Sequence, residues 1–235
     1  MPAILRRDLE YLIAFQGPAE NPLLGDGRWL NGQVDGVGWT NFQSSPVLGA
    51  YGTMLGPSPP YSDSCLYRLP PPGQVWSADT EIETQIQVKN QGAFSGFHEL
   101  EHLHRGRISA NFNTCYEFIL SVGPTTYCEA VIWNGPLGVV VGGDGAFTFL
   151  TGQQPCPLPG NGDWFKSTCI GNLLRMYHRT DAGSYGAPLF TYDIRNTSLR
   201  LWDGYPGLGW WKNGAQTAQD DYSFLRARFS AGWDA

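Results

Sequence analysis

The stretch that decides the fold is FHELEHLHRGRISANFNTCYEFILSVGPTTYCEAVIWNGPLG, from Phe97 to Gly138. Its segment HELEH, at positions 98–102, matches the HExxH motif of zinc peptidases. That chemistry needs a helix, so that both histidines share one face and bind one metal ion while the glutamate activates water. A helix capped by Ser95 and ended by Gly106 is one interpretation of this segment.

The alternation of residue types favours a strand instead. From Glu99 to Asn113, one set of alternating positions is mostly apolar and the other is mostly charged or polar, which is the period of a β-strand. On a strand, His98 and His102 lie about 13 Å apart, at about 3.3 Å per residue, and Glu99 points to the opposite face. One zinc ion cannot bind both rings at Zn–N distances of about 2.0–2.1 Å. The sequence therefore predicts a strand here and no metal site.

A hairpin follows this strand, with its turn at Gly123-Pro124-Thr125-Thr126. The alternation on either side of the turn pairs Val122 with Tyr127 and Tyr116 with Trp133, and places these side chains in the core. Together with the preceding strand, the hairpin makes a predicted antiparallel meander.

The composition of the 235 residues fits one large all-β domain. Hydrophobic residues make up 42%, which is ample for a core, while 30 glycines and 17 prolines indicate many turns and few long helices. More than ten short strands separated by turn residues predict a β-sandwich or barrel. We expect a single domain over residues 1–235, with its core at about 9–230.

Charge and hydropathy exclude several classes of function. The net charge of −6 argues against a nucleic-acid partner. No segment has the length of a membrane span, and the first residues lack the apolar run of a signal peptide, so we expect a protein made in the cytoplasm without a secretion signal. No cofactor-binding motif is present.

Five cysteines cannot all pair with one another. None lies in a CxxC pair, so a structural zinc site is not expected. We predict mostly reduced, buried thiols, and a disulfide between Cys156 and Cys169 is left open.

Several short segments along the chain share a pattern: RW at Arg28-Trp29, RGRIS at 105–109, YEF at 116–118, IWNGPLG at 132–138, GD at Gly162-Asp163 and YPGLGWW at 205–211. Together they resemble segments of concanavalin A-like lectin and glucanase jelly-roll domains. More particularly, they resemble versions of this domain found in virion proteins of tailed phages. The resemblance implies an all-β, two-sheet antiparallel β-sandwich with a concave face, and it covers about Leu9 to Ser230.

The resemblance suggests a non-enzymatic virion protein, located on the capsid as a decoration or on the tail as an adhesin. Its expected partners are other virion proteins and a host-surface glycan, without a membrane partner, and self-assembly into homo-oligomers is left open. Glycosidases of this fold use an ExDxE-like run of carboxylates, but position 103 after Glu99-Leu100-Glu101 is leucine. A glycosidase using Glu99 and Glu101 is therefore the alternative hypothesis. Glu81 and Glu83 share a strand face with two glutamines, which is typical of a solvated surface.

Tryptophans beside polar turn residues are the predicted ligand-binding site. A tryptophan ring can stack on a sugar while neighbouring Asp or Asn side chains bind its hydroxyls. The predicted ligand contacts are Trp202, Asp203, Trp210, Trp211 and Asn213. Trp210 and Trp211 are adjacent and on a strand must point to opposite faces, so at most one of them lies in the core. No metal ligands and no catalytic residues are assigned.

Overall fold

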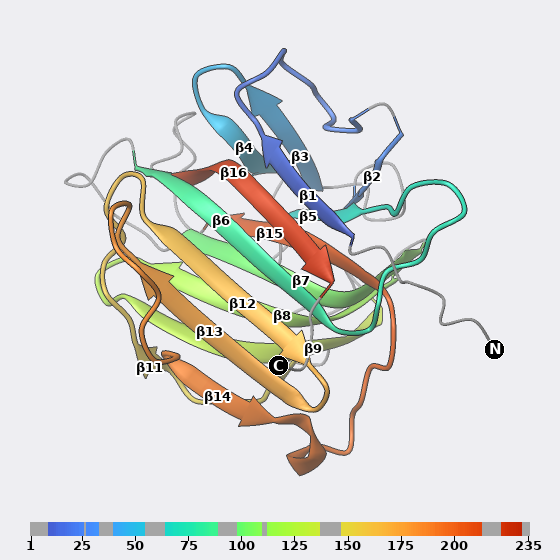
Figure 1. Ribbon diagram of the computed structural model, residues 1–235, viewed down its shortest axis with the longest axis vertical. Coiled ribbons are helices and arrows are strands. Elements are labelled where there is room, and N and C mark those ends of the chain that lie inside the picture. Colours follow the sequence, from blue (N-terminus) through green and yellow to red (C-terminus); the bar gives the residue numbers. More distant parts are fainter. Residues whose placement is uncertain are drawn as a thin grey trace, which may run out of the picture.

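A computed structural model describes residues 9–25, 27–32, 40–54, 64–88, 98–109, 112–136, 147–212 and 222–231. These residues form two antiparallel sheets that pack face to face as a β-sandwich (Figure 1). The predicted all-β, two-sheet architecture is confirmed. Within the described ranges, no helix has the length and apolar character needed to cross a membrane.

Sheet A, the front layer in Figure 1, has the order β14-β13-β12-β6-β16-β4-β3, and β1 also pairs with β16. Its strands are β1 (Glu10–Ala14), β3 (Thr40–Ser45), β4 (Gly49–Met54), β6 (Thr80–Val88), β12 (Trp164–Ile170), β13 (Leu173–Arg179), β14 (Phe190–Asp193) and β16 (Tyr222–Ala231). The last described strand of the chain, β16, therefore lies inside the sheet, between β6 and β4.

Sheet B, the rear layer, has the order β10-β9-β8-β7-β15-β5-β2, with β11 paired to β9. Its strands are β2 (Trp29–Asn31), β5 (Ser64–Arg68), β7 (His98–Ser109), β8 (Phe112–Val122), β9 (Tyr127–Pro136), β10 (Phe147–Phe149), β11 (Gln154–Pro155) and β15 (Tyr205–Lys212). The predicted meander is the β7-β8-β9 part of this sheet. The short 3-10 helix η1 (Ile194–Asn196) follows β14.

The HExxH segment lies on β7 and is a strand, as predicted. Its histidines point into the space between the sheets, where His102 and His104 both contact Ser167 of β12. The Ser167 hydroxyl lies 2.8 Å from His102 Nδ1 and 2.7 Å from His104 Nε2. The other ring nitrogens contact Thr84 and Thr80 of β6, at 2.8 and 2.7 Å. The five side chains thus form one hydrogen-bonded chain that joins the two sheets through the core.

This buried chain needs no charge. Each hydroxyl can donate one hydrogen bond and accept another, so the chain is satisfied when both histidines are neutral and carry their proton on the same ring nitrogen. Burial lowers the pKa of His102 to about 3, and burial, with His102 and Arg105 nearby, lowers the pKa of His104 well below 6.5. Both rings are therefore neutral core residues, and each of their four nitrogens has a hydroxyl partner.

The strict alternation predicted from Glu99 to Asn113 is wrong beyond His104, because β7 contains a β-bulge. The pairing with β8 shifts between His104 and Arg107, and Arg105 has a positive φ of 53°. An extra residue in one strand reverses which side chains face the core. Ile108 accordingly packs against an apolar cluster on the outer face of sheet B.

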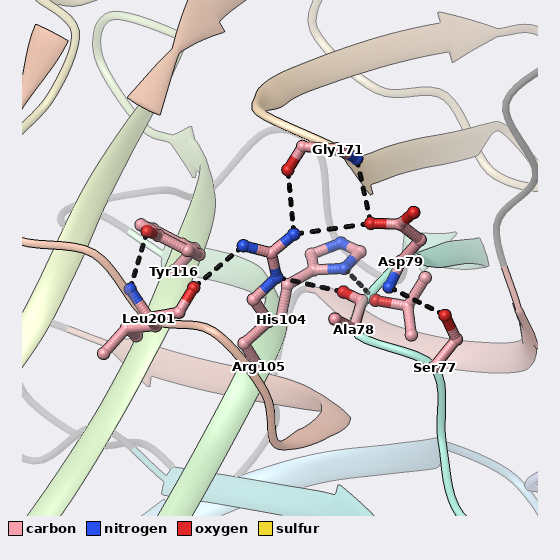
Figure 2. Close-up of polar contacts among 9 residues, drawn as sticks. Ser77, Ala78, Asp79, His104, Arg105, Tyr116, Gly171 and Leu201 are labelled. Atoms are coloured by element: carbon pink, nitrogen blue, oxygen red, sulfur yellow. Dashed lines mark hydrogen bonds and ion pairs between the residues drawn. The ribbon is translucent and has the colours of Figure 1, made fainter. Parts of the chain in front are cut away.

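Arg105 is buried at the bulge and binds three separate segments (Figure 2). Its Nε donates to the Ala78 carbonyl at 3.0 Å, and its Nη1 donates to the Leu201 carbonyl at 2.8 Å. Its Nη2 donates to the Gly171 carbonyl at 2.9 Å and lies 3.4 Å from Asp79 Oδ1. One guanidinium group thereby connects β7 with the start of β6, the β12–β13 turn and the segment that leads into β15.

The predicted register of the β8–β9 hairpin is wrong by one residue. Tyr127 pairs with Ser121 and not with Val122, so Cys115, and not Tyr116, lies opposite Trp133. A shift of one residue moves every side chain of the second strand to the other face. Trp133 is therefore buried on the outer face of sheet B, whereas the sequence placed it in the core between the sheets.

Two further expectations are corrected by the contacts of the side chains. Glu83 is buried and not solvated, because it accepts hydrogen bonds from the Arg228 guanidinium of β16. No disulfide joins any of the five cysteines, all of which lie in described parts of the chain. Cys156 hydrogen-bonds to the Cys128 thiol, while Cys169 is buried in the core on β12, so the open pairing of Cys156 with Cys169 is not formed.

Candidate functional site

The outer face of sheet B, which points away from sheet A, carries a concentration of carboxylates and aromatic rings. On β7 this face presents Glu99 and Glu101, because Leu100 and His102 point inward. The neighbouring strands contribute further side chains to the same face: Glu117 and Ile119 from β8, Tyr127, Glu129 and Trp133 from β9, Trp211 from β15 and Tyr67 from β5. We call Glu99, Glu101, Glu117 and Glu129 the acidic cluster.

The strand register brings the four glutamates together. Glu101 and Glu129 both lie opposite Ile119, on its two sides, so they share one row across the sheet. Glu117 lies one row away, opposite Leu103 and Val131, and hydrogen-bonds to Glu101. Glu101 and Glu129 lie two strands apart, at about 10 Å, and Glu99 and Glu101 are about 7 Å apart along β7, so the register gathers the carboxyl groups on one face without placing any two directly opposite each other.

Glycine at position 209 makes room for Glu101. Gly209 of β15 lies opposite Glu101, and a Cβ atom built on Gly209 would lie 1.8 Å from Glu101 Oε2. The Glu101 side chain therefore lies across β15, in space that any other residue at position 209 would occupy. The backbone of β15 thus forms part of the floor of the acidic cluster.

Burial makes the acidic cluster hold a proton. Glu101 and Glu117 are each 1% exposed, and the Trp133 indole Nε1 donates a hydrogen bond to Glu117 Oε2. Burial raises the pKa of Glu117 to about 8, and the charges of Glu99 and Glu129 act in the same direction. Burial also raises the pKa of Glu129. A hydrogen bond between two carboxyl groups requires a proton on one of them, so the Glu101–Glu117 pair is not doubly charged at neutral pH.

The side chains at one end of this face are more exposed to solvent than those of the buried glutamates. Glu99, Tyr127 and Trp211 are half-buried, whereas Glu101, Glu117 and Glu129 are buried. These three half-buried residues share one row across the sheet, because Glu99 is opposite both Trp211 and Ser121, and Ser121 is opposite Tyr127. Trp211 is next to Glu99, whereas Tyr127 is two strands beyond Glu99, at about 10 Å. We call Glu99, Tyr127 and Trp211 the rim. An indole, a phenol and a carboxylate at the rim provide a flat apolar surface with hydrogen-bonding groups beside it.

The structure separates the predicted ligand contacts. Trp210 is 2% exposed, and its indole donates to the Tyr222 carbonyl at 3.3 Å inside the sandwich, so it is the core member of the Trp210–Trp211 pair. Trp211 is on the outer face of sheet B at the rim. Trp202 is 68% exposed, beside Asp203, which forms an ion pair with Arg107. Asn213 lies outside the described residues.

Trp202 and Asp203 do not belong to the same site as Trp211. Trp211 is opposite Glu99, whereas Asp203 pairs with Arg107, eight positions further along β7. At about 3.3 Å per residue, the two places are about 26 Å apart. The predicted set of tryptophans and polar residues is therefore split between opposite ends of sheet B.

Glu117, Glu129 and Trp133 are site residues that the sequence reasoning missed. The hairpin register off by one residue placed Glu129 and Trp133 on the core face. The sequence contained a signal against that register. The register placed the Glu129 carboxylate among core side chains without a partner, and burying an unpaired carboxylate costs free energy. Moving the register by one residue brings Glu117, Glu129 and Trp133 to the face that already carried Glu99 and Glu101.

No group of three or more His, Cys, Asp or Glu side chains in the described part of the chain is placed to hold a metal ion. The acidic cluster itself favours protons over a cation, because its two most buried carboxyl groups hydrogen-bond to each other. Its arrangement suits the recognition of hydroxyl groups by carboxylates and rings at the rim.

No protein-family model and no curated sequence matches this chain. Solved structures do resemble it. The exoplasmic/lumenal domain of VIP36, in its Ca2+/Man3GlcNAc-bound form, matches with a TM-score of 0.58 and 12% identity over 96% of this chain and 92% of that one. The carbohydrate-binding module CBM66 from Bacillus subtilis matches with a TM-score of 0.47 and 15% identity over 86% and 91%.

A xylan beta-1,4-xylosidase from Bacillus halodurans C-125 matches with a TM-score of 0.46 and 12% identity, over 93% of this chain and 38% of that one. At these identities the likeness concerns the fold, and the VIP36 domain carries it over nearly the whole length of both chains. The chain thus has the concanavalin A-like jelly-roll sandwich that its sequence resembled.

Proposed function

We propose that this protein binds carbohydrate, without cleaving it, at the rim on the outer face of sheet B. The observation that carries the proposal is the half-buried Trp211 indole beside the Glu99 carboxylate, with the Tyr127 phenol in the same row two strands beyond Glu99. A ring can stack on the apolar face of a sugar, while a carboxylate accepts hydrogen bonds from neighbouring hydroxyls. The likeness to the VIP36 domain, whose structure holds Man3GlcNAc, supports a saccharide as the ligand.

The acidic cluster supports a binding role over glycoside hydrolysis. Glycosidases hold two carboxyl groups about 5–9.5 Å apart, on either side of the scissile bond. Glu101 and Glu117 instead bind each other directly, and both are buried beneath the face. Glu99 is the accessible carboxylate of the alternative Glu99–Glu101 pair, and its partner Glu101 is held by Glu117. The four glutamates thus fix the charge and shape of the site.

Glycan-array binding of the purified protein, with bacterial surface polysaccharides included, tests the proposal. We expect saturable binding to at least one saccharide, weakened about tenfold or more by Trp211→Ala, which corresponds to about 1.4 kcal/mol of lost stacking. Trp202→Ala is the matched control, because it removes an exposed tryptophan about 26 Å away, at the far end of β7. Equal loss in the two variants, or no saccharide bound by the wild type, would overturn the proposal.

A reducing-end assay on any saccharide that binds tests the absence of cleavage. We expect no turnover by the wild-type protein. Turnover that disappears in the double variant Glu99→Gln/Glu101→Gln would show a glycosidase and refute the non-enzymatic part of the proposal.

We also propose that the domain is a component of a tailed-phage particle, as a capsid decoration or a tail-associated adhesin. This proposal rests on the sequence resemblance alone, and a glycan-binding face would suit a surface-displayed protein that gains from many weak contacts. Mass spectrometry of purified heads and tails would locate the chain. Its absence from both fractions, with the chain found only in lysate, would refute the virion role.

A further inference from the structure

Two arginines line a pair of cavities at the end of the molecule where β1, β2 and β5 meet (Figure 1). The cavities have volumes of about 320 and 500 Å³, and both are lined by Arg28 and Arg68. Arg68 ends β5 and pairs with Trp29 of β2. The larger cavity is closed on one side by Pro70, Pro71 and Pro72.

Arg68 is held rigidly between aromatic rings. Its guanidinium carbon lies 4.8 Å from the centroid of the Tyr11 ring and 5.0 Å from that of Trp29. The backbone around it is fixed as well, because the Trp76 indole donates to the Arg68 carbonyl at 2.8 Å. Cation–π contacts of this kind stabilise a guanidinium group and orient its plane, but they leave its N–H edges free to bind an anion.

The charge of Arg68 is not neutralised by any described carboxylate. The side chain is 5% exposed, its Nη1 donates to the Arg28 carbonyl at 3.3 Å, and its buried Nε has no hydrogen-bond partner. None of the ion pairs among the described residues includes Arg68 or Arg28. Burial, and then the neighbouring charge of Arg28, lower the pKa of Arg68. A buried cation that has no counter-ion among the described residues, and that lies beside a second cation, is an unfavourable arrangement that a bound anion would relieve.

Among the described residues that line the two cavities, the one carboxylate has other partners. Glu20 borders the smaller cavity, and its Oε2 accepts hydrogen bonds from the backbone N–H groups of Leu24 and Gly25, at 3.0 and 2.7 Å. The described lining of the larger cavity contains both arginines and no acidic residue. The charged side chains among the described lining of the larger cavity are therefore both positive, in a protein whose net charge is −6.

We propose that the cavity bordered by Arg28, Arg68, Tyr11 and the three prolines is a binding site for a compact oxyanion, a carboxylate or a phosphate group. The planar guanidinium of Arg68 presents its N–H edge to two oxygens of such a group, and Arg28 adds a second positive charge from the exposed side. The Tyr11 ring and the prolines form the walls against which the rest of the ligand lies. The site is separate from the rim on sheet B and does not depend on the carbohydrate proposal.

Isothermal titration with sodium phosphate, sodium acetate and sodium glucuronate tests the site, at a constant ionic strength of about 0.15 M, where the Debye length is about 8 Å. We expect saturable binding of at least one anion to the wild-type protein. Binding of phosphate alone would assign the site to phosphate groups, and binding of acetate or glucuronate would assign it to carboxylates. Glucose, which resembles glucuronate without its charge, should not bind there.

Arg28→Gln is the decisive variant, because Arg28 is exposed and its replacement leaves the packed Arg68 in place. We expect it to weaken anion binding about tenfold or more, as for the loss of a charge-assisted hydrogen bond. Arg226→Gln, which removes an exposed arginine on β16, is the matched control and should change the affinity less than about twofold. Arg68→Lys keeps the charge but removes the planar fork and should also weaken binding.

Three outcomes would overturn the proposal: no saturable binding of any of the anions, equal effects of Arg28→Gln and Arg226→Gln, or full binding in Arg28→Gln. Trp211→Ala should bind the anion like the wild type. Loss of glycan binding with retained anion binding in that variant would separate the two sites, so that failure of either proposal leaves the other standing.

Discussion

Arg105 combines a backbone conformation that non-glycine residues avoid with a side chain that is almost fully hydrogen-bonded. A φ of 53° places it in the left-handed region, which costs an L-residue free energy. Four contacts to Ala78, Asp79, Gly171 and Leu201 offset that cost (Figure 2). The bulge is therefore stable because the side chain that it redirects satisfies groups on three other segments.

Replacing Arg105 by Lys should lower the free energy of unfolding by about 3 kcal/mol or more, because an ammonium group cannot reach the three carbonyls together and leaves some of them buried without partners. Urea denaturation followed by tryptophan fluorescence measures the change. Arg107→Lys is the matched control on the same strand, since its ion pair with Asp203 is exposed and worth at most about 1 kcal/mol. Similar losses in the two variants would contradict this account of the bulge.

The raised pKa of Glu117 predicts a dependence of stability on pH. Its pKa is about 8 in the folded protein, whereas a glutamate in an unfolded chain has its ordinary pKa of 4.5. The folded state therefore binds the proton more tightly than the unfolded state. The stabilising contribution is full below about pH 4.5 and is lost as the pH rises to about 8. Above about pH 7.5, one unit above the ordinary histidine pKa of 6.5, His102 and His104 are almost entirely neutral in both states and contribute little.

Between about pH 7.5 and pH 8, the free energy of unfolding should therefore fall, by at most about 1.4 kcal/mol per pH unit. Glu117→Gln keeps the shape and cannot ionise, so its stability should change less over the same range. Urea denaturation at intervals of pH measures both slopes. If the free energy of unfolding fell equally with pH in the wild type and the variant, Glu117 would not be the cause of the pH dependence.

At the scale of elements, β7 serves both faces of sheet B with alternating residues. Its inward histidines join the two sheets through Ser167 of β12, and its outward glutamates form part of the acidic cluster. The alternation of β7 made its strand conformation and the inward direction of His102 predictable from the sequence. Its bulge was not predictable, because it depends on the contacts of Arg105 with segments that are distant in the chain.

The Ser167 hydroxyl is the link between the sheets at this point. Ser167→Ala should destabilise the protein by about 2–4 kcal/mol, because one nitrogen of each buried histidine loses its hydrogen-bond partner. Ser230→Ala, at the half-buried end of β16, is the control and should change stability by less than about 0.5 kcal/mol. A neutral effect of Ser167→Ala in urea denaturation would mean that the histidines are satisfied in another way.

The register of the β8–β9 hairpin shows where element-level prediction fails. The turn at Gly123–Thr126 and the two strands around it were identified, but neither alternation nor turn length distinguished pairing of Tyr127 with Ser121 from pairing with Val122. The choice is made by contacts across the sheet, where Trp133 hydrogen-bonds to Glu117 and packs against Phe147 with ring centroids 4.5 Å apart. That single choice decides whether Glu129 and Trp133 belong to the core or to the acidic cluster.

At the scale of the whole molecule, the two-sheet sandwich was predictable because many short alternating segments and frequent turns leave few other architectures. The order of strands was not predictable, since β16 joins β6, β4 and β1 although these lie far away in the chain. The site residues were only partly predictable for the same reason. Trp202 and Trp211 are close in sequence, but the sheet places them at opposite ends of β7.

The sandwich is held together without covalent cross-links among its cysteines. Titration of the unreduced protein with a thiol reagent under denaturing conditions should give all 5 thiols. Addition of a reductant should leave the thermal midpoint unchanged, because no disulfide constrains the unfolded chain. Fewer than 5 titratable thiols before reduction, together with a lower midpoint after it, would reveal a disulfide and contradict the structure.

The interior position of β16 has a consequence for how the protein is made. Arg228 of β16 binds Glu83 of β6, although 145 residues separate them in the chain. During translation at about 5–20 residues per second, one edge of β6 stays unpaired for on the order of ten seconds, until β16 leaves the ribosome. An unpaired edge is a template for pairing with other chains. The nascent protein is therefore most vulnerable to aggregation just before β16 emerges, and a chain terminated ahead of Tyr222 leaves sheet A permanently open at its centre.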